Sequence, residues 1–132
     1  MISRESITDL EVSKLLDIAK DETLFLPRSW ALEELSRRSL HDDSILDEIL
    51  PIIGREIRVK TRSGVPVGAK AALILVDENS DDINRRIAES MNGWEYYAQS
   101  DFFTLVMKDS DGSISASWVR NYGLNRKTND HE

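Results

Sequence analysis

Side chains able to do chemistry are sparse in this chain of 132 residues, which contains two histidines and no cysteine. His131 is next to the last residue, so His41 stands alone beside Asp42 and Asp43. A zinc site is usually built from several His or Cys ligands, and the sequence does not supply that set. A Ser-His-Asp triad can assemble from distant positions, but the chain has no Gly-x-Ser-x-Gly turn to present a serine nucleophile. We interpret His41 as a loop or capping residue.

Two further segments resemble ligand loops only in part. Asp109-Ser-Asp-Gly-Ser begins like a calcium-binding loop, but the twelfth position of that loop would be Arg120 instead of the glutamate that ligates calcium. The glycines at Gly64 and Gly68 lack the lysine and serine of a phosphate-binding loop. The sequence therefore predicts a turn at Asp109, no metal or other cofactor, no catalytic residue, and a protein that is not an enzyme.

The net charge of −7 disfavours nonspecific binding to nucleic acids and anionic membranes, because both depend on a cationic surface. Residues 55–70 are an exception, with five bases and one acid. We interpret this basic island as a solvated connection, and a binding patch is the alternative. Residues 56–62 fit either a helix or a strand, of which we prefer a helix to about residue 58. The bases of the island are Arg55, Arg58, Lys60, Arg62 and Lys70.

Apolar residues repeat at intervals of three and four over the first two thirds of the chain, which is typical of amphipathic helices. This spacing predicts five helices, and Pro51 should kink the third of them or end it early. The longest apolar run, residues 65–76, is apolar on nearly every side, so we expect this helix to be buried in the core. The predicted helices cover approximately residues 9–20, 27–39, 45–58, 66–76 and 82–91.

Beyond Gly93 the apolar period changes to two. Residues 103–108 and 114–119 alternate on either side of Asp109-Ser-Asp-Gly112, a strong signal for a β-hairpin. An isolated hairpin is marginal in water, so it should pack on the helices and cover Leu73 and Ile74, with residues 94–98 as a possible third strand. We thus expect one α+β domain, mostly α: helical over residues 1–91, β over residues 92–122, and a frayed tail over residues 123–132.

An internal repeat links two of the predicted helix pairs. Pro27 and Pro66 each open a helix at an offset of 39 residues, and the same offset relates Asp42-Asp43 to Asp81-Asp82 ahead of the second helices. Paired helices with a period near 40 resemble HEAT-type repeats, and Arg28-x-x-Ala31-x-x-x-Leu35 looks like the spacing common in them. The resemblance covers residues 26–91 and implies stacked antiparallel helix pairs, capped at the end by the C-terminal hairpin.

Two groups of side chains are candidates for binding a partner. The first is acidic and is expected on the outer faces of the second and third helices: Glu33, Glu34, Asp42, Asp43, Asp47 and Glu48. The second is aromatic, and within it we select Trp94, Tyr96 and Tyr97, because tryptophan and tyrosine are the usual anchors of protein interfaces. Phe102, Phe103 and Trp118 complete this aromatic group.

A small, acidic, cysteine-free domain without catalytic residues is similar in general character to the immunity proteins of bacterial toxin systems, including contact-dependent growth inhibition. The resemblance implies a cytoplasmic protein that occludes the active site of a cognate toxin, such as a basic nuclease, with its acidic surface. The alternatives are a HEAT-like protein–protein adaptor, an enzyme with an unrecognised site and, last, a nucleic-acid binder that uses the basic island.

A helix-turn-helix at residues 31–53 would bind DNA poorly. Asp47 and Glu48 lie in its second helix, where hydrogen-bond donors to phosphates and bases are needed. The chain has no segment that predicts membrane insertion.

Overall fold

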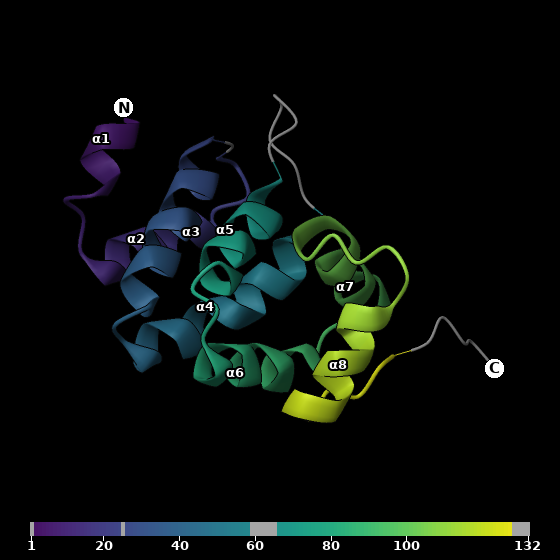
Figure 1. Cartoon of the computed structure of the whole chain (residues 1–132). Helices are drawn as coiled ribbons and strands as arrows, with labels where there is room; N and C mark the ends of the chain where they lie inside the picture. The colour runs from purple at the N-terminus through teal and green to yellow at the C-terminus, as the bar shows by residue number, and fades with distance from the viewer. Residues whose placement is uncertain (1, 25, 59–65, 128–132) are drawn as a thin grey trace.

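The computed structural model describes residues 2–24, 26–58 and 66–127. Within these residues the chain is helical and has no sheet. Figure 1 shows the helices following one another from the N-terminal α1 on one side of the molecule to α8 on the other. In chain order they are α1 (Arg4–Ile7), α2 (Val12–Lys20), α3 (Leu26–Ser39), α4 (Asp43–Glu56), α5 (Val67–Val76), α6 (Asp81–Met91), α7 (Tyr96–Asp101), the π-helical segment η1 (Phe102–Val106) and α8 (Ser113–Tyr122).

Taken in chain order as the pairs α1–α2, α3–α4, α5–α6 and η1–α8, the helices lie in two layers, and α7 contacts η1 and α4. The first member of each pair packs on the first member of the next, so that α1, α3, α5 and η1 form one layer. The second members, α2, α4, α6 and α8, follow one another in the other layer. The buried apolar side chains of both layers form one continuous core. Each of the two layers therefore has its own solvent-exposed surface.

The helices α4 and α5 approach each other closely at Gly68. A Cβ atom placed on this glycine would lie 2.6 Å from the Ile57 amide nitrogen and 2.7 Å from the Ile53 carbonyl oxygen. Both atoms belong to the backbone, which cannot turn aside as a side chain can. The first turn of α5 therefore lies directly against the last turn of α4, and only glycine fits at this contact.

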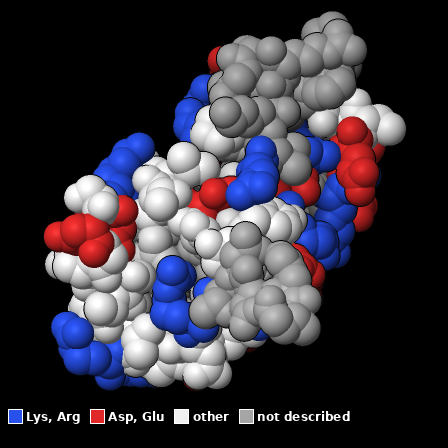
Figure 2. All heavy atoms as spheres, turned by 90° about the vertical axis from the view of Figure 1, so that its right-hand side faces the viewer, with Lys and Arg blue, Asp and Glu red and all other residues white. Residues whose placement is uncertain are grey.

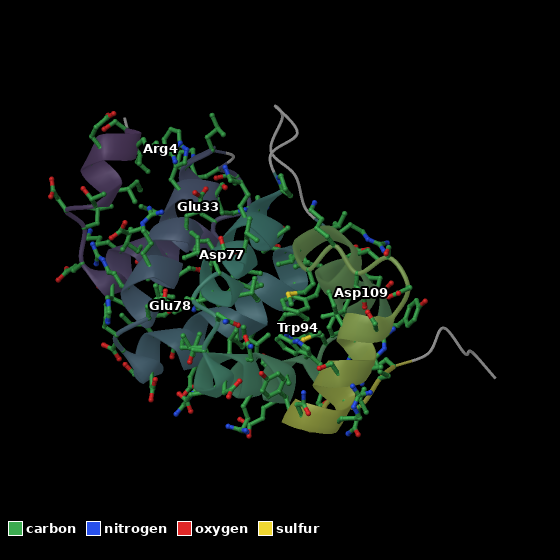
Figure 3. All side chains as sticks on the ribbon, viewed as in Figure 1. Arg4, Glu33, Asp77, Glu78, Trp94 and Asp109 are labelled. Atoms are coloured by element: carbon green, nitrogen blue, oxygen red, sulfur yellow. The ribbon has the colours of Figure 1, made fainter. Side chains whose placement is uncertain are left out.

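The helix α3 is buried on several sides although its sequence is polar. It packs against α1, α2, α4 and α5, and Arg28 and Glu33 are 7% and 6% exposed. Arg28 forms an ion pair with Glu56 at the end of α4, with 2.9 Å between Nη2 and Oε1. Ser29 Oγ donates a hydrogen bond to Glu33 at 3.1 Å, and Figure 3 shows Arg4 on the same side of the molecule as Glu33. The orientation expected for Glu33, outward into solvent, is wrong.

The predicted β C-terminus is wrong, and so is the count of five helices, because residues 96–122 form α7, η1 and α8. Phe102 is the centre of this region, with its ring 6.1 Å from Trp94, 5.3 Å from Phe103 and 5.4 Å from Trp118, all edge to face. Such arrangements are the favourable ones for aromatic rings. Of the apolar residues that alternate in sequence, Phe103 and Trp118 thus join an aromatic core on a helical backbone, whereas Leu105 and Ala116 remain exposed.

The helix α5 is also less covered than expected. Leu73 is 43% exposed, and Lys70 and Asp77 are exposed on the same side of the helix. A hairpin does not cover Leu73; η1 packs beside it instead. Of the other predictions, α3, α5 and α6 begin and end within a residue of their predicted limits, and α4 continues through Pro51. Residues 59–64, for which we expected a loop after the helix, and residues 128–132 of the predicted frayed tail lie outside the described residues. Residues 123–127 of that tail are described and are held in place, since Leu124 is 2% exposed and the Asn125 amide donates to Asn92 Oδ1 at 2.7 Å.

The turn at Asp109 starts a helix instead of joining two strands. Its carboxylate accepts the Gly112 amide at 3.0 Å and the Ser115 amide at 2.9 Å, and Gly112 has the left-handed φ of 82°. The Ser115 amide belongs to the first turn of α8, where backbone donors lack a partner within the helix. Figure 3 shows Asp109 beside the start of α8. The turn was predicted correctly, but its side chain caps a helix.

Substitution of Gly68 tests the contact between α4 and α5. We expect Gly68→Ala to lower the free energy of unfolding by about 1–3 kcal/mol, because the added methyl group must push α5 away from the backbone of α4. Gly93→Ala is the matched control, since a Cβ atom there would lie 3.5 Å from its nearest neighbour, the Ser90 carbonyl oxygen. Urea denaturation measures both. Equal midpoints for the two variants would contradict the close approach.

Acid titration tests the start of α8. Hydrogen bonds from the Ser115 amide first, and then from Ile114 and Gly112, hold the pKa of Asp109 below its ordinary value of 3.8. A carboxyl whose pKa is lowered by folding stabilises the fold above its unfolded pKa, and this contribution is lost as the pH falls through the folded pKa. We therefore expect Asp109→Asn to be less stable than the natural protein at neutral pH. The difference should begin to shrink as the pH falls below the ordinary value of 3.8 and should vanish only below the lowered pKa of the folded state.

The control for this titration is Asp9→Asn, which changes an exposed aspartate whose carboxylate accepts no hydrogen bond from a described residue. Urea midpoints measured across the acid range should overlay for Asp9→Asn and the natural protein. A difference between Asp109→Asn and the natural protein that persists unchanged into acid would show that the ionised carboxylate does not stabilise α8.

Candidate functional site

The acidic residues of α4 and α6 meet around Arg86. Its guanidinium lies 3.0 Å from Asp43 and 3.4 Å from Asp47, both on α4, and 3.5 Å from Asp82 on its own helix. The two Asp-Asp pairs that mark the repeat in the sequence therefore open neighbouring helices of one layer. The name acidic face is used below for the exposed residues Asp42, Asp43, Asp47, Glu48, Asp81 and Asp82.

The acidic face keeps a negative charge in spite of Arg86. One guanidinium balances the charge of only one of the three carboxylates around it. The side chains of Asp43, Asp47 and Asp82 are 65%, 67% and 70% exposed. The Coulomb attraction of Asp43 is the main cause that raises the pKa of Arg86. Exposed ion pairs of this kind contribute about 0–1 kcal/mol to stability. Their main effect is therefore on the field that a partner meets.

Two other members of the acidic face also have a structural task. Asp42 is the N-cap of α4, where its carboxylate accepts hydrogen bonds from the hydroxyl and the amide of Ser44. These two bonds, the hydroxyl first, lower the pKa of Asp42. Asp81 accepts the hydroxyl of Tyr122 at 2.8 Å, which links α6 to α8. Both side chains are exposed. We found no described partner for the carboxylate of Glu48.

The remaining acids of the predicted surface lie elsewhere. Glu33 is buried in α3, and the Glu34 side chain is 12% exposed and paired with Arg37 and Arg38 of the same helix at 3.2 Å and 3.0 Å. These two residues belong to the first layer, whereas the acidic face belongs to the second. The structure thus separates the predicted set: it brings Asp42, Asp43, Asp47 and Glu48 together and leaves Glu33 and Glu34 out.

Asp81, Asp82 and Arg86 were not among the residues predicted for this site. The signal was present, because the offset of 39 residues that aligns Asp42-Asp43 with Asp81-Asp82 also implies that the two pairs open neighbouring helices. In a stacked repeat, residues at equivalent positions lie side by side on adjacent units. Arg86 and Asp47 are themselves 39 residues apart and in contact.

The aromatic candidates are at the other end of α4. Trp94 is 7% exposed, packs against Gly54 and donates its indole N–H to Ser90 at 3.2 Å. Figure 3 shows Trp94 directed into the body of the molecule between α6 and α7. Tyr97 is partly exposed and lies 4.6 Å beneath the guanidinium of Arg58, a cation–π contact. Tyr96 is also partly exposed.

A half-open pocket of about 210 Å³ joins these aromatics to α4. The exposed stripe of α4 runs from Asp43, Asp47 and Glu48 through Pro51 to this pocket. An acidic area and an aromatic pocket thus lie along one helix, less than one turn apart between Glu48 and Pro51. The pocket is lined by Pro51, Gly54, Arg55, Gly93, Trp94, Glu95 and Tyr97.

The basic island does not form one patch in the described part of the chain. Arg58 is held at 2.7 Å by Asp101, whose hydrogen bond is the main cause that raises the pKa of Arg58. Arg55 lines the pocket beside Trp94, and Lys70 projects from α5. Lys60 and Arg62 lie outside the described residues. The ion pair of Arg58 with Asp101 therefore links α7 to the end of α4.

Among the residues that the structure describes, no three His, Cys, Asp or Glu side chains gather in a way that could hold a metal ion. The described helices include none with the length and apolar character needed to cross a membrane.

Figure 2 shows the end of the molecule nearest α7 and α8, where acidic and basic side chains form small separate groups among uncharged ones. No family model, curated protein or solved structure gives a significant match to the chain.

Truncation of Trp94 tests whether it belongs to the core or to the surface. Because its ring is buried against Gly54 and Phe102, we expect Trp94→Ala to cost about 3–5 kcal/mol of unfolding free energy. Tyr96→Ala, a change at a partly exposed aromatic, should cost about 1 kcal/mol. Both values come from urea denaturation. A loss at Trp94 no larger than the loss at Tyr96 would show that Trp94 is available as a surface anchor.

Proposed function

We propose that the protein binds a basic protein partner through the acidic face and so blocks the surface of that partner. The observation that carries the proposal is the meeting of α4 and α6 around Arg86. Three carboxylates from these two helices surround one guanidinium, so two negative charges remain unbalanced there. A surface with one dominant sign of charge accelerates capture of an oppositely charged protein and excludes partners of like charge.

The mechanism is electrostatic capture followed by occlusion. Long-range attraction orients a cationic partner before contact, and this steering weakens as salt shortens the Debye length to about 8 Å at physiological ionic strength. Contacts at the pocket beside Pro51 then slow dissociation, with Tyr97 as the accessible aromatic. A cationic active site covered in this way cannot reach its own substrate.

The partner class we propose is a bacterial toxin with a basic active site, such as a nuclease, and the protein would then be its immunity protein. This proposal extends the resemblance drawn from composition and charge. It places the protein in the cytoplasm, where such a toxin acts. A cysteine-free chain is compatible with that reducing compartment.

A HEAT-like adaptor is the second candidate, and the stacking of the helices favours it. First helices pack on first helices and second helices on second helices through all four pairs, which is how helical repeats create extended binding surfaces. An adaptor would use the same faces to hold two proteins together. It differs from an immunity protein in leaving the activity of its partners intact.

Charge neutralisation on α4 tests the proposed function. The variant carries Asp42→Asn, Asp43→Asn, Asp47→Asn and Glu48→Gln, and the asparagine at position 42 still caps the helix. Affinity capture from the source organism supplies a partner, which is then purified. Stopped-flow association at low salt should be slower by about tenfold for the variant, because electrostatic steering contributes a factor of that order or more.

The matched control neutralises two exposed acids of the N-terminal segment, Glu11→Gln and Asp17→Asn, and should leave the association rate unchanged. Equal association rates for the fourfold variant and the natural protein would exclude the acidic face. An enzymatic assay of the captured partner separates the two candidates, since an immunity protein abolishes its activity and an adaptor does not.

A further inference from the structure

A second candidate surface lies on the other layer, where α5 and η1 enclose a shallow groove of about 170 Å³. Leu73 of α5 is 43% exposed and Leu105 of η1 is 44% exposed. The buried side chains of Ala69 and Val106 form part of the lining between these two leucines. An apolar groove between packed helices is the form of site that receives an amphipathic peptide helix.

Two lysines flank the groove. Lys70 projects from α5 and Lys108 follows η1, and both are exposed. Neither ammonium group forms an ion pair with a described residue, although the chain carries a net charge of −7. Asp109, the acid next to Lys108, is directed toward the amides of Gly112 and Ser115. The two charged side chains that line the groove are therefore both positive. Asp77, which is exposed on the same side of α5 about one turn beyond Leu73, is not among the lining residues.

The backbone beside the groove is unusual in two ways. The segment η1 is a π-helix, in which the Met107 amide donates to the Phe102 carbonyl at 3.1 Å, and π-helical turns occur frequently at functional sites. Lys108 adopts the left-handed φ of 55°, which is unfavourable for a residue with a side chain. This conformation keeps Lys108 among the residues that line the groove.

The size and charge of the groove indicate the kind of ligand that it can bind. A volume of about 170 Å³ is well below that of a typical small-molecule site, so the groove suits one or two side chains of a protein segment. A second copy of this chain fits poorly. Its other exposed large apolar residues in the described ranges are Leu26 and Val119, which are next to Pro27 and Arg120 and not next to acids.

From the exposed leucines, the two lysines that form no ion pair with a described residue, and the small volume together, we infer that the groove between α5 and η1 binds an acidic amphipathic helix of a second partner protein. An aliphatic or aromatic side chain of that helix enters between Leu73 and Leu105. Carboxylates that flank this anchor pair with Lys70 and Lys108. This surface belongs to the first layer, so it is independent of the acidic face and of the proposed function.

Selection from a random peptide display library on the immobilised full chain tests this inference. We expect the enriched peptides to share an apolar anchor flanked by Asp or Glu. One such peptide, synthesised with a fluorescent label, should lose about 30-fold in affinity to Leu105→Ser by fluorescence anisotropy, the equivalent of about 2 kcal/mol for an interface anchor. The double variant with Lys70→Glu and Lys108→Glu should bind it about tenfold more weakly, because a favourable pairing becomes a repulsion.

Two controls match these variants. Val119→Ser changes an apolar side chain of similar exposure on α8, and Lys20→Glu reverses an exposed lysine on α2. Both should bind the peptide as the natural protein does. A variant with Asp43→Asn and Asp47→Asn should also bind it normally, which separates failure of this inference from failure of the acidic face. Thermal unfolding of every variant confirms that it is folded.

The inference is overturned if enriched peptides lack acids, if no peptide is enriched, or if Leu105→Ser binds as well as Val119→Ser. Co-sedimentation with phosphatidylserine vesicles gives one more outcome. Sedimentation that depends on Leu105 and Lys108, together with an absence of enriched acidic peptides, would assign the groove to a membrane surface and would also overturn the inference.

Discussion

The direct contact of α5 with the backbone of α4 at Gly68 is the constraint on which the rest of the structure depends. It occurs where Glu56 ends α4, and the side chain of the same glutamate reaches Arg28 of α3. Three helices from both layers therefore meet at one end of α4. A buried ion pair is a costly way to join helices, but removal of one partner is costlier still, so it fixes a single arrangement of these helices.

The interiors of the two halves of the molecule are filled by different kinds of side chain. In the N-terminal half, the central helix α3 buries Arg28, Ser29 and Glu33. Arg28 pairs with Glu56 through Nη2 and Ser29 donates to Glu33, while the buried Nε of Arg28 has no hydrogen-bond partner among the described residues. In the C-terminal half, Phe102 gathers other aromatic rings around itself. Close packing of the interior leaves the surface of each layer free to differ. The second layer is acidic, and the first combines apolar and cationic residues.

The sequence located α3, α5 and α6 closely, because each has a recognisable start: Pro27 and Pro66 open the first two, and the pair Asp81-Asp82 opens the third. It failed beyond Gly93 for a physical reason. Ile114 and Trp118 are separated by two strand repeats or by one helical turn, so a short segment fits both periods. Asp109 and Gly112 favour a left-handed turn in either case, and the turn here precedes a helix because its carboxylate is directed at the Ser115 amide. Four of the six residues of the acidic face were predicted, whereas the position of Arg86 between the carboxylates depends on the stacking of α4 on α6.

Carboxylates at helix starts need no functional explanation by themselves, since they cap amide groups and oppose the helix dipole. Asp42 has this role in α4. The favourable effect of the dipole is confined to the first turn, however, and Asp47 and Glu48 lie beyond it. Asp47 shares Arg86 with two other acids, and the carboxylate of Glu48 has no described partner. These two charges exceed what the helix requires, and this excess is what an acidic binding surface would need.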